Sequence, residues 1–174
     1  MTPARPPGRG AIVALGSNLG DSRRILVDCL DELRRRAPDG FVASSLWRST
    51  PVECPPGSPD FLNAVCRWDV GPHFPTPESL LDQLQSLERD FGRRPRKVLN
   101  ESRPLDLDLI AFGDAVRNGP RLVLPHPRAH QRRFVLAPLH EIDPGLVLPG
   151  WTRTVAELLS DLPAGRGDEV HRLP

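Results

Sequence analysis

The order of apolar runs and helical stripes constrains the fold of this chain more than any other feature of its sequence. Short apolar runs such as residues 11–15 are typical of buried strands, whereas Leu80, Leu84 and Leu87 repeat at the spacing of one helix face. The pattern runs strand, helix, strand, strand, helix, strand, over residues 11–15, 25–33, 41–47, 61–68, 77–91 and 103–114. This order predicts an α+β, ferredoxin-like sandwich, in which helices cover one face of an antiparallel sheet and extra elements follow at the C-terminal end.

The length of 174 residues is enough for one domain with its own hydrophobic core. Beyond residue 114 the pattern is less regular, with a short extended piece at 121–124. Thr154 and Glu157 have the spacing of a capping box, which predicts a last helix. We expect a disordered lead-in rich in Pro, Gly and Arg, then a single domain, then a loose tail, over residues 1–10, 11–162 and 163–174.

The composition argues against several classes of protein. A formal net charge of +1 gives no overall field that would draw the chain to nucleic acid or to a membrane. No apolar run approaches the ~18 residues of a membrane span, and the first ten residues lack the apolar stretch of a signal peptide. The three cysteines are widely spaced and match no zinc or disulfide pattern. We therefore expect a cytoplasmic protein with no nucleic-acid or membrane partner.

Asp106 and Asp108 are the most informative pair of polar residues. Residues 103–114 are typical of a buried strand, on which side chains two apart share a face, so the two carboxylates lie about 7 Å apart. They point the same way as Ile110 and Phe112, where two like charges are unfavourable without a compensating cation. Mg²⁺ is usually held by one or two carboxylates together with substrate phosphates. The alternative is a strand whose first half is exposed and whose acids are merely solvated.

Basic and polar neighbours favour a site for phosphates and magnesium. The loop at 93–97 reads Arg-Arg-Pro-Arg-Lys, and Arg103 precedes the strand that carries the two aspartates. Lys97 is the only lysine, so arginine is the usual cation of this chain, and a simple charged loop is the alternative. Gln85 and Glu88 are neighbours on one helix face, where a solvated helix edge is the alternative.

Two other segments could shape or contact a phosphate site. Residues 16–20 lie between a strand and a helix but lack the spacing of a Walker or Rossmann motif, so we interpret them as a turn that shapes a pocket. His126 lies between two prolines, which form a rigid mount for a phosphate contact. A purely structural histidine is the alternative.

Five segments, in order and at compatible spacing, resemble the 6-hydroxymethyl-7,8-dihydropterin pyrophosphokinases of folate biosynthesis. They are residues 14–21 (ALGSNLGD), 60–65 (DFLNAV), 88–93 (ERDFGR), 103–108 (RPLDLD) and the stretch 124–139 with LPHPR and RRFVLAPL. The resemblance covers about residues 11–150. It implies transfer of pyrophosphate from the co-substrate ATP to the hydroxymethyl group of the pterin, with release of AMP and with two Mg²⁺ ions.

The resemblance also implies roles for individual residues. Asp106 and Asp108 would hold both ions and would be catalytic together with Arg93 and Arg103. The pterin ring would lie between Phe61 and Phe134 and bind Asn63, and backbone groups around Ser49, Thr50 and Val52 would read its edge. Contacts to the ATP phosphates or ribose are implied for Arg93, Arg103, Arg121, His126 and Arg132. Gln85 and Glu88 would line the nucleotide side of the site, and Leu109 and Val123 would lie near adenine.

The chemistry suits such a site, because a flat pterin needs aromatic faces and transfer between phosphates needs positioning and charge neutralisation. We expect a monomer in which the hydroxyl attacks the β-phosphorus in line, without a protein nucleophile. Some members of the family carry Trp-Gly-Pro where this chain has residues 100–102, Asn-Glu-Ser, so a lid indole at Asn100 is absent. The alternatives are a nucleic-acid-binding module that uses the loop at 93–97 and a nucleotide sensor without catalysis.

Overall fold

The computed structural model describes residues 10–37, 39–70, 76–164 and 169–174, so the predicted lead-in lies outside the described residues except for Gly10. A central sheet has the strand order β5-β1-β4-β3-β8, and all these neighbours are antiparallel. Its strands are β1 (Gly10–Ser17), β3 (Trp47–Ser49), β4 (Phe61–Asp69), β5 (Asp106–Phe112) and β8 (Val170–Arg172), and β2 (Val42–Ala43) also pairs with β4. Strands β5, β1, β4 and β3 thus take the order of a ferredoxin-like sheet.

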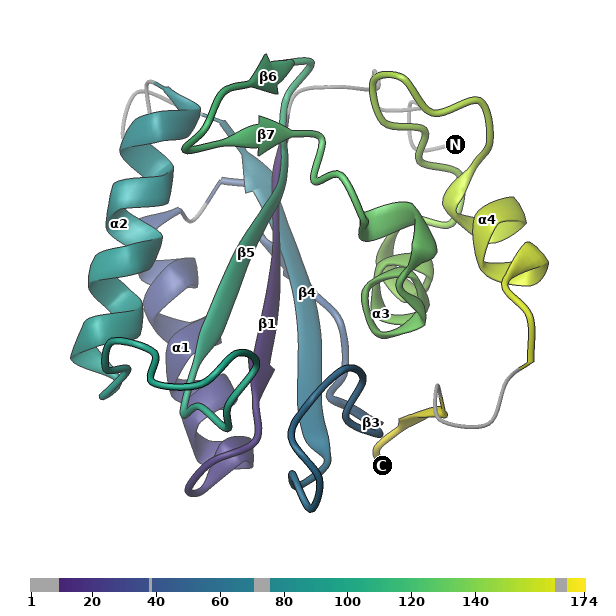
Figure 1. The fold of residues 1–174 in the computed structure, drawn as a ribbon. Coiled ribbons are helices and arrows are strands. Elements are labelled where there is room, and N and C mark those ends of the chain that lie inside the picture. Colours follow the sequence, from purple (N-terminus) through teal and green to yellow (C-terminus); the bar gives the residue numbers. More distant parts are fainter. Residues whose placement is uncertain (1–9, 38, 71–75, 165–168) are drawn as a thin grey trace.

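Helices cover both faces of the sheet (Figure 1). The leucine stripes of α1 (Ser22–Arg36) and α2 (Pro77–Asp90) pack on one face, in a core that contains Leu26, Leu30, Leu84 and Leu87. On the other face, α3 (Arg133–Ile142) and α4 (Val155–Asp161) close a second core with Val135, Leu136 and Val155. The predicted α+β, ferredoxin-like class is confirmed, with α1 and α2 on one face as expected, and the extra C-terminal elements include the two helices that cover the other face.

The sequence pattern did not predict α3, and its composition explains why. Residues 135–139 are five consecutive buried apolar side chains, and a short continuous apolar run cannot be assigned to a helix or a strand by its periodicity alone. Pro138 lies inside the helix, and no side chain caps its first turn. Burial in the second core therefore stabilises a helix that the local sequence pattern does not predict.

A β-bulge in β5 corrects the predicted side-chain alternation. Ile12 pairs with Ala111 and Val13 pairs with Leu109, so Ile110 is an extra residue. Asp106, Asp108 and Ile110 share the face of α3, as expected. After the bulge the alternation reverses, so Phe112 packs with the core under α1 and α2, and its predicted position beside the aspartates is wrong.

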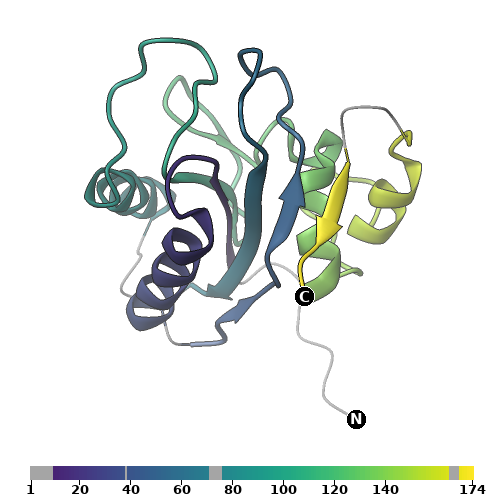
Figure 2. The same ribbon diagram turned by 90° about the horizontal axis from the view of Figure 1, so that it is seen from below.

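The predicted strand at 41–47 is divided into β2 and β3, because one extra residue lies opposite β4 between Ala43 and Trp47. Within the predicted loose tail, residues 170–172 form β8 and pair with β3, which differs from the expectation (Figure 2). A separate two-stranded sheet of β6 (Arg117–Asn118) and β7 (Val123–Leu124) precedes a short 3-10 helix at Ala129–Gln131. Among the helices described, none has the length and apolar character needed to cross a bilayer.

Candidate active site

A cavity of about 550 Å³ opens on the α3 face of the sheet. Its floor is formed by the small residues Ala14 and Gly16 of β1, and the antiparallel register places Asp106 and Asn63 on either side of Gly16. Loops 50–60 and 91–105 extend from this end of the sheet in both views (Figures 1 and 2). Small floor residues between two polar ones leave room for a ligand above the central strands.

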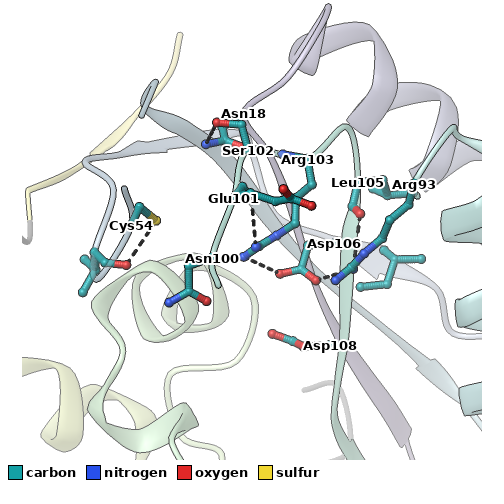
Figure 3. A network of polar contacts seen from close by, with 12 residues as sticks. Asn18, Cys54, Arg93, Asn100, Glu101, Ser102, Arg103, Leu105, Asp106 and Asp108 are labelled. Carbon is teal, nitrogen blue, oxygen red and sulfur yellow. Dashed lines mark hydrogen bonds and ion pairs between the residues drawn. The ribbon is translucent and has the colours of Figure 1, made fainter. Parts of the chain in front are cut away.

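Asp106 is held by two arginines (Figure 3). Arg93 Nη1 donates to Asp106 Oδ1 at 2.6 Å, and Arg103 Nη2 lies 3.2 Å from Asp106 Oδ2. All three side chains are largely buried, with 14–21% of their surface exposed. Each carboxylate oxygen therefore has a cationic partner that fixes the orientation of Asp106 at the edge of the cavity.

Asp108 is less fully compensated than Asp106. Its nearest cation is Arg132, whose Nη1 lies 3.7 Å from Asp108 Oδ2. Burial and the Asp106 carboxylate raise the pKa of Asp108 to about 6, against the opposing effect of Arg132. Within the described residues, no three His, Cys, Asp or Glu side chains gather as a closed metal site. A cation bound to these two acids would thus take further oxygen ligands from phosphates and water, as Mg²⁺ commonly does.

Glu88 does not line the cavity but supports Asp106 through Arg93. Its Oε1 accepts hydrogen bonds from Arg93 Nη1 at 2.5 Å and from the backbone N–H of Leu107 at 2.7 Å. Burial raises the pKa of Glu88 to about 7, although the bond from Leu107 and the charge of Arg93 act in the opposite direction. Arg93 therefore links the end of α2 to β5 and contacts Asp106 directly.

Two phenylalanines face the cavity, each beside an arginine. The guanidinium carbon of Arg103 lies 5.5 Å from the centre of the Phe61 ring, and that of Arg132 lies 5.5 Å from the centre of the Phe134 ring. Phe61 comes from β4 and Phe134 from the first turn of α3, so the two rings line the cavity from different elements. Such a pair of aromatic faces can hold a flat ring.

Asn63 presents a defined edge to the same cavity. Its Nδ2 donates to Ser49 Oγ at 2.7 Å, and both side chains are nearly completely buried. The amide oxygen is then free of this bond and lies near Gly16, where a Cβ would come within 3.5 Å of it. Asn63 thus offers a carbonyl oxygen that can accept a hydrogen bond from a ligand N–H.

His126 is oriented by its own backbone and by the segment after it. Its N–H donates to the carbonyl of Ile110 at 2.9 Å, and its Nδ1 accepts from the backbone N–H of Arg128 at 3.2 Å. Burial lowers the pKa of His126 to about 4, and Arg132 and Arg128 add to this effect. The neutral ring then carries its hydrogen on Nε2 and can donate it to an anionic oxygen.

Comparisons with known proteins show to which family this chain belongs. The family described as 7,8-dihydro-6-hydroxymethylpterin-pyrophosphokinase (HPPK) matches residues 12–144. This chain belongs to the HPPK family. A 2-amino-4-hydroxy-6-hydroxymethyldihydropteridine pyrophosphokinase of Pseudomonas aeruginosa is 39% identical over 163 residues, which cover 93% of this chain and 95% of that protein. A protein of the same name from Haemophilus influenzae is 36% identical over 150 residues, covering 86% and 90%. The predicted enzyme class, a pyrophosphokinase of folate biosynthesis, is thereby confirmed.

Some HPPK relatives are much longer than this chain. The chain covers 18% of the folic acid synthesis protein fol1 of Pneumocystis carinii, to which it is 36% identical over 138 residues. A solved HPPK-DHPS chain of Plasmodium falciparum has the same fold, with a TM-score of 0.70 at 12% identity, over 96% of this chain and 49% of that one. This likeness supports the fold alone.

Most of the residues that the HPPK resemblance implies line the cavity. Those that do are Ser49, Thr50, Val52, Phe61, Asn63, Arg103, Asp106, Asp108, His126, Arg132 and Phe134. Arg93 and Glu88 lie behind Asp106. The structure does not bring the other four to the cavity: Gln85 is exposed on α2, Leu109 is in the core under α1 and α2, Arg121 pairs with Asp82, and Val123 lies in β7. Their roles stay predictions.

The structure adds cavity residues that the sequence did not assign. Asn100 Nδ2 donates to the carbonyl of Glu53 at 2.7 Å, and Arg128 Nη1 lies 3.4 Å from Glu53 Oε2. Glu53 and Asn100 both have a positive φ, of 53° and 55°, which non-glycine residues rarely adopt. Cys54, Arg96 and Gln131 also line the cavity. Pairing between two distant loops has no periodicity, so no sequence signal could have predicted it.

Proposed function

We propose that this chain transfers pyrophosphate from ATP to the hydroxymethyl group of 6-hydroxymethyl-7,8-dihydropterin, with release of AMP, and that Asp106 and Asp108 hold the required Mg²⁺. The observation that carries the proposal is the presence of both aspartates and both phenylalanines, Phe61 and Phe134, around one cavity. Aromatic faces suit a pterin, and paired carboxylates suit metal-bound phosphates. Family membership supports the reaction itself.

The pterin half of the cavity is built for a flat ring with polar edges. Phe61 and Phe134 offer two faces, and the Asn63 oxygen and the backbone near Ser49 and Thr50 offer hydrogen-bonding groups. These groups orient the substrate so that its hydroxymethyl group points toward the two aspartates. Holding the nucleophile in line in this way removes much of the entropic barrier to transfer.

The phosphate half combines acids with cations and a neutral donor. Asp106 and Asp108 fit a hard divalent cation, and we propose that these two carboxylates would hold two such ions. When bound, Mg²⁺ neutralises the charge that builds up on the phosphate oxygens. Arg103 and Arg132 add fixed positive charge, and His126 Nε2 can donate to a phosphate oxygen without carrying charge itself.

In the proposed reaction no side chain acts as a nucleophile, so no covalent intermediate forms on the protein. The pterin hydroxyl oxygen forms a bond to the β-phosphorus and loses its proton to solvent, while the bond from that phosphorus to the oxygen of AMP breaks. Arg93 and Glu88 hold Asp106 in place during this step and do not themselves react. We further propose that the protein is a cytoplasmic monomer without a nucleic-acid or membrane partner.

The test compares two aspartates that are both paired with arginine. Asp106→Asn should reduce AMP release from ATP and the hydroxymethyl pterin by about 100-fold or more, because charge stabilisation at the reacting phosphate is lost. Asp161→Asn is the matched control, since Asp161 pairs with Arg153 on α4 away from the cavity and its loss should leave AMP release unchanged. Both assays are run with Mg²⁺ and with EDTA.

Near-normal turnover of Asp106→Asn, or full activity in EDTA, would contradict the metal assignment. Tight binding of ATP without any AMP release by the unaltered protein would instead indicate a nucleotide sensor. Binding to RNA that weakens steeply with salt, without binding to ATP, would indicate a nucleic-acid-binding module.

A further inference from the structure

Glu141, on α3, collects hydrogen-bond donors from two other segments of the chain, residues 45–47 and β8, although it lies outside the cavity. Its Oε1 accepts from Ser45 Oγ at 2.7 Å, and its Oε2 accepts from Trp47 Nε1 at 2.9 Å. The backbone N–H of Ser45 also donates to both oxygens, at 3.2 and 3.1 Å, and Arg172 Nη2 lies 3.4 Å from Oε1. These donors lower the pKa of Glu141, although burial acts in the opposite direction, so the carboxylate is kept ionised.

The contacts of Glu141 replace a missing part of the sheet. Between β2 and β3 the ladder with β4 is interrupted, and the N–H of Ser45 turns to the carboxylate of Glu141 instead of to a neighbouring strand. Arg172 of β8 also donates through Nε to Ser45 Oγ at 3.0 Å. One carboxylate therefore joins the start of β3, the C-terminal strand and α3.

β3 is in turn held on both edges. Trp47 pairs with Asn63 of β4 on one side and with Arg172 of β8 on the other. At the cavity end, the N–H of Thr50 donates to the carbonyl of Glu169 at 3.2 Å. Without β8, β3 would be a three-residue edge strand fixed on one side only, and short edge strands open readily.

The far end of β3 enters the cavity. Ser49 and Thr50 line it, and Ser49 Oγ orients the Asn63 amide through the 2.7 Å hydrogen bond. A shift of β3 would therefore move both the backbone at 49–50 and the direction of the Asn63 oxygen. The aspartates and Arg132 lie on other elements and would keep their positions.

We propose that Glu141 and Arg172 are positioning residues for the pterin half of the cavity: by fastening β8 and the start of β3 to α3, they hold Ser49, Thr50 and Asn63 in register for the pterin. This inference rests on the proposed function. It assigns a role in substrate binding to the C-terminal strand, which touches no substrate. The two aspartates of the phosphate half lie on β5, which Glu141 and Arg172 do not contact.

The test replaces the charge of Glu141 while keeping its size. Glu141→Gln has one acceptor oxygen in place of two, so at least one donor meets an amide N–H₂. The KM for the pterin should rise about tenfold, the effect of losing one charge-assisted hydrogen bond, whereas the KM for ATP and kcat stay near the wild-type values. Arg172→Gln should act in the same direction. The double variant should add little, because both changes release the same strand.

Glu32→Gln is the matched control. Glu32 is exposed to 28% against 24% for Glu141, and it bridges Arg35 and Arg36 at 2.6 and 2.7 Å on α1, across the sheet from the cavity. Its loss should leave both KM values unchanged. Amide hydrogen exchange at residues 47–50 gives a readout without catalysis, and it should accelerate in Glu141→Gln and not in Glu32→Gln. All assays are run well below each variant's unfolding midpoint.

The results separate the two proposals. An active wild-type enzyme whose Glu141→Gln and Arg172→Gln variants keep the wild-type KM for the pterin would overturn the positioning role and leave the proposed function intact. An equal rise in KM for both substrates would also overturn it, because a general loosening of the fold would then be the cause. Absence of AMP release by the unaltered protein would instead contradict the proposed function.

Discussion

At the scale of single residues, Arg103 and Arg132 each join one carboxylate to one aromatic ring. Arg103 lies against Asp106 and Phe61, and Arg132 lies near Asp108 and Phe134. A guanidinium can serve both partners, because it forms hydrogen bonds in its plane and stacks through its face. The proposed metal half and the proposed pterin half are therefore built from shared side chains.

Phe134→Leu tests the aromatic half. Loss of one ring face should weaken binding of the pterin about tenfold in the absence of ATP, the scale of an aromatic stacking contact together with its lost area. Fluorescence titration or calorimetry measures this. Phe41→Leu is the control, because Phe41 also lies beneath an arginine, Arg34, but stacks on Trp68 on the other face of the sheet. Equal binding of the pterin by Phe134→Leu and the unaltered protein would rule out the sandwich.

The three cysteines differ sharply in their expected reactivity. Cys29 and Cys66 are fully buried, and burial raises the pKa of both thiols, that of Cys29 to about 12. Cys54 lines the cavity. A thiol reagent should therefore modify one cysteine of the folded protein, and the pterin with a nonhydrolysable ATP analogue and Mg²⁺ should slow that reaction. Cys54→Ser should show no fast reaction, and modification of two or more thiols in the native protein would contradict the expectation.

The sequence predicted residues of the site best where local chemistry identified them. The spacing of Asp106 and Asp108 on a strand was enough to place both acids on one face, and the structure has them there. Glu53 and Asn100 could not be predicted, because their contact depends on how two loops fold against each other. The place near adenine that the family resemblance implies for Leu109 stays a prediction, and strand alternation directs its side chain to the core under α1 and α2.

At the scale of elements, prediction succeeded for helices in which apolar and charged residues alternate along the chain, and failed for α3, whose middle is a continuous apolar run. The stripes of α1 and α2 alternate with charged residues, so their period is visible, whereas α3 is apolar at every position from 135 to 139. The bulge at Ile110 and the pairing of β8 depend on partners distant in sequence. Tertiary contacts determine these features, so the local sequence pattern does not predict them.

The capping box of α4 allows a direct test at this scale. Thr154 Oγ1 accepts from the N–H of Glu157 at 3.2 Å, as the sequence predicted. Thr154→Ala should lower the free energy of unfolding by about 1 kcal/mol in urea titrations, with unchanged kinetics, since α4 packs on α3 away from the substrates. Ser160→Ala, at an exposed position of the same helix, is the control and should have little effect. A loss of activity in Thr154→Ala without loss of stability would contradict this separation.

At the scale of the whole molecule, one sheet serves two purposes on its two faces. The face under α1 and α2 is a continuous apolar core. The face under α3 and α4 is apolar over part of its area and carries the cavity at the end of β1, β4 and β5. The rigid core beneath fixes the strands, so polar groups that would not fold stably by themselves are held in place above them.

This arrangement predicts that stability and function oppose each other at Asp108. Burial and Asp106 raise the pKa of Asp108 to about 6. Above that pH the ionised carboxylate therefore destabilises the fold when no metal is bound. Because the Asp108 side chain is 35% exposed, solvent screening reduces this cost to about 1 kcal/mol. Asp108→Asn should therefore raise the free energy of unfolding in EDTA at pH 8 by about this amount. A nonhydrolysable ATP analogue with Mg²⁺ should stabilise the unaltered protein strongly and the variant much less. Thermal unfolding with and without these ligands measures both effects. If Asp108→Asn is less stable than the unaltered protein in EDTA, the carboxylate stabilises the fold and the prediction is wrong.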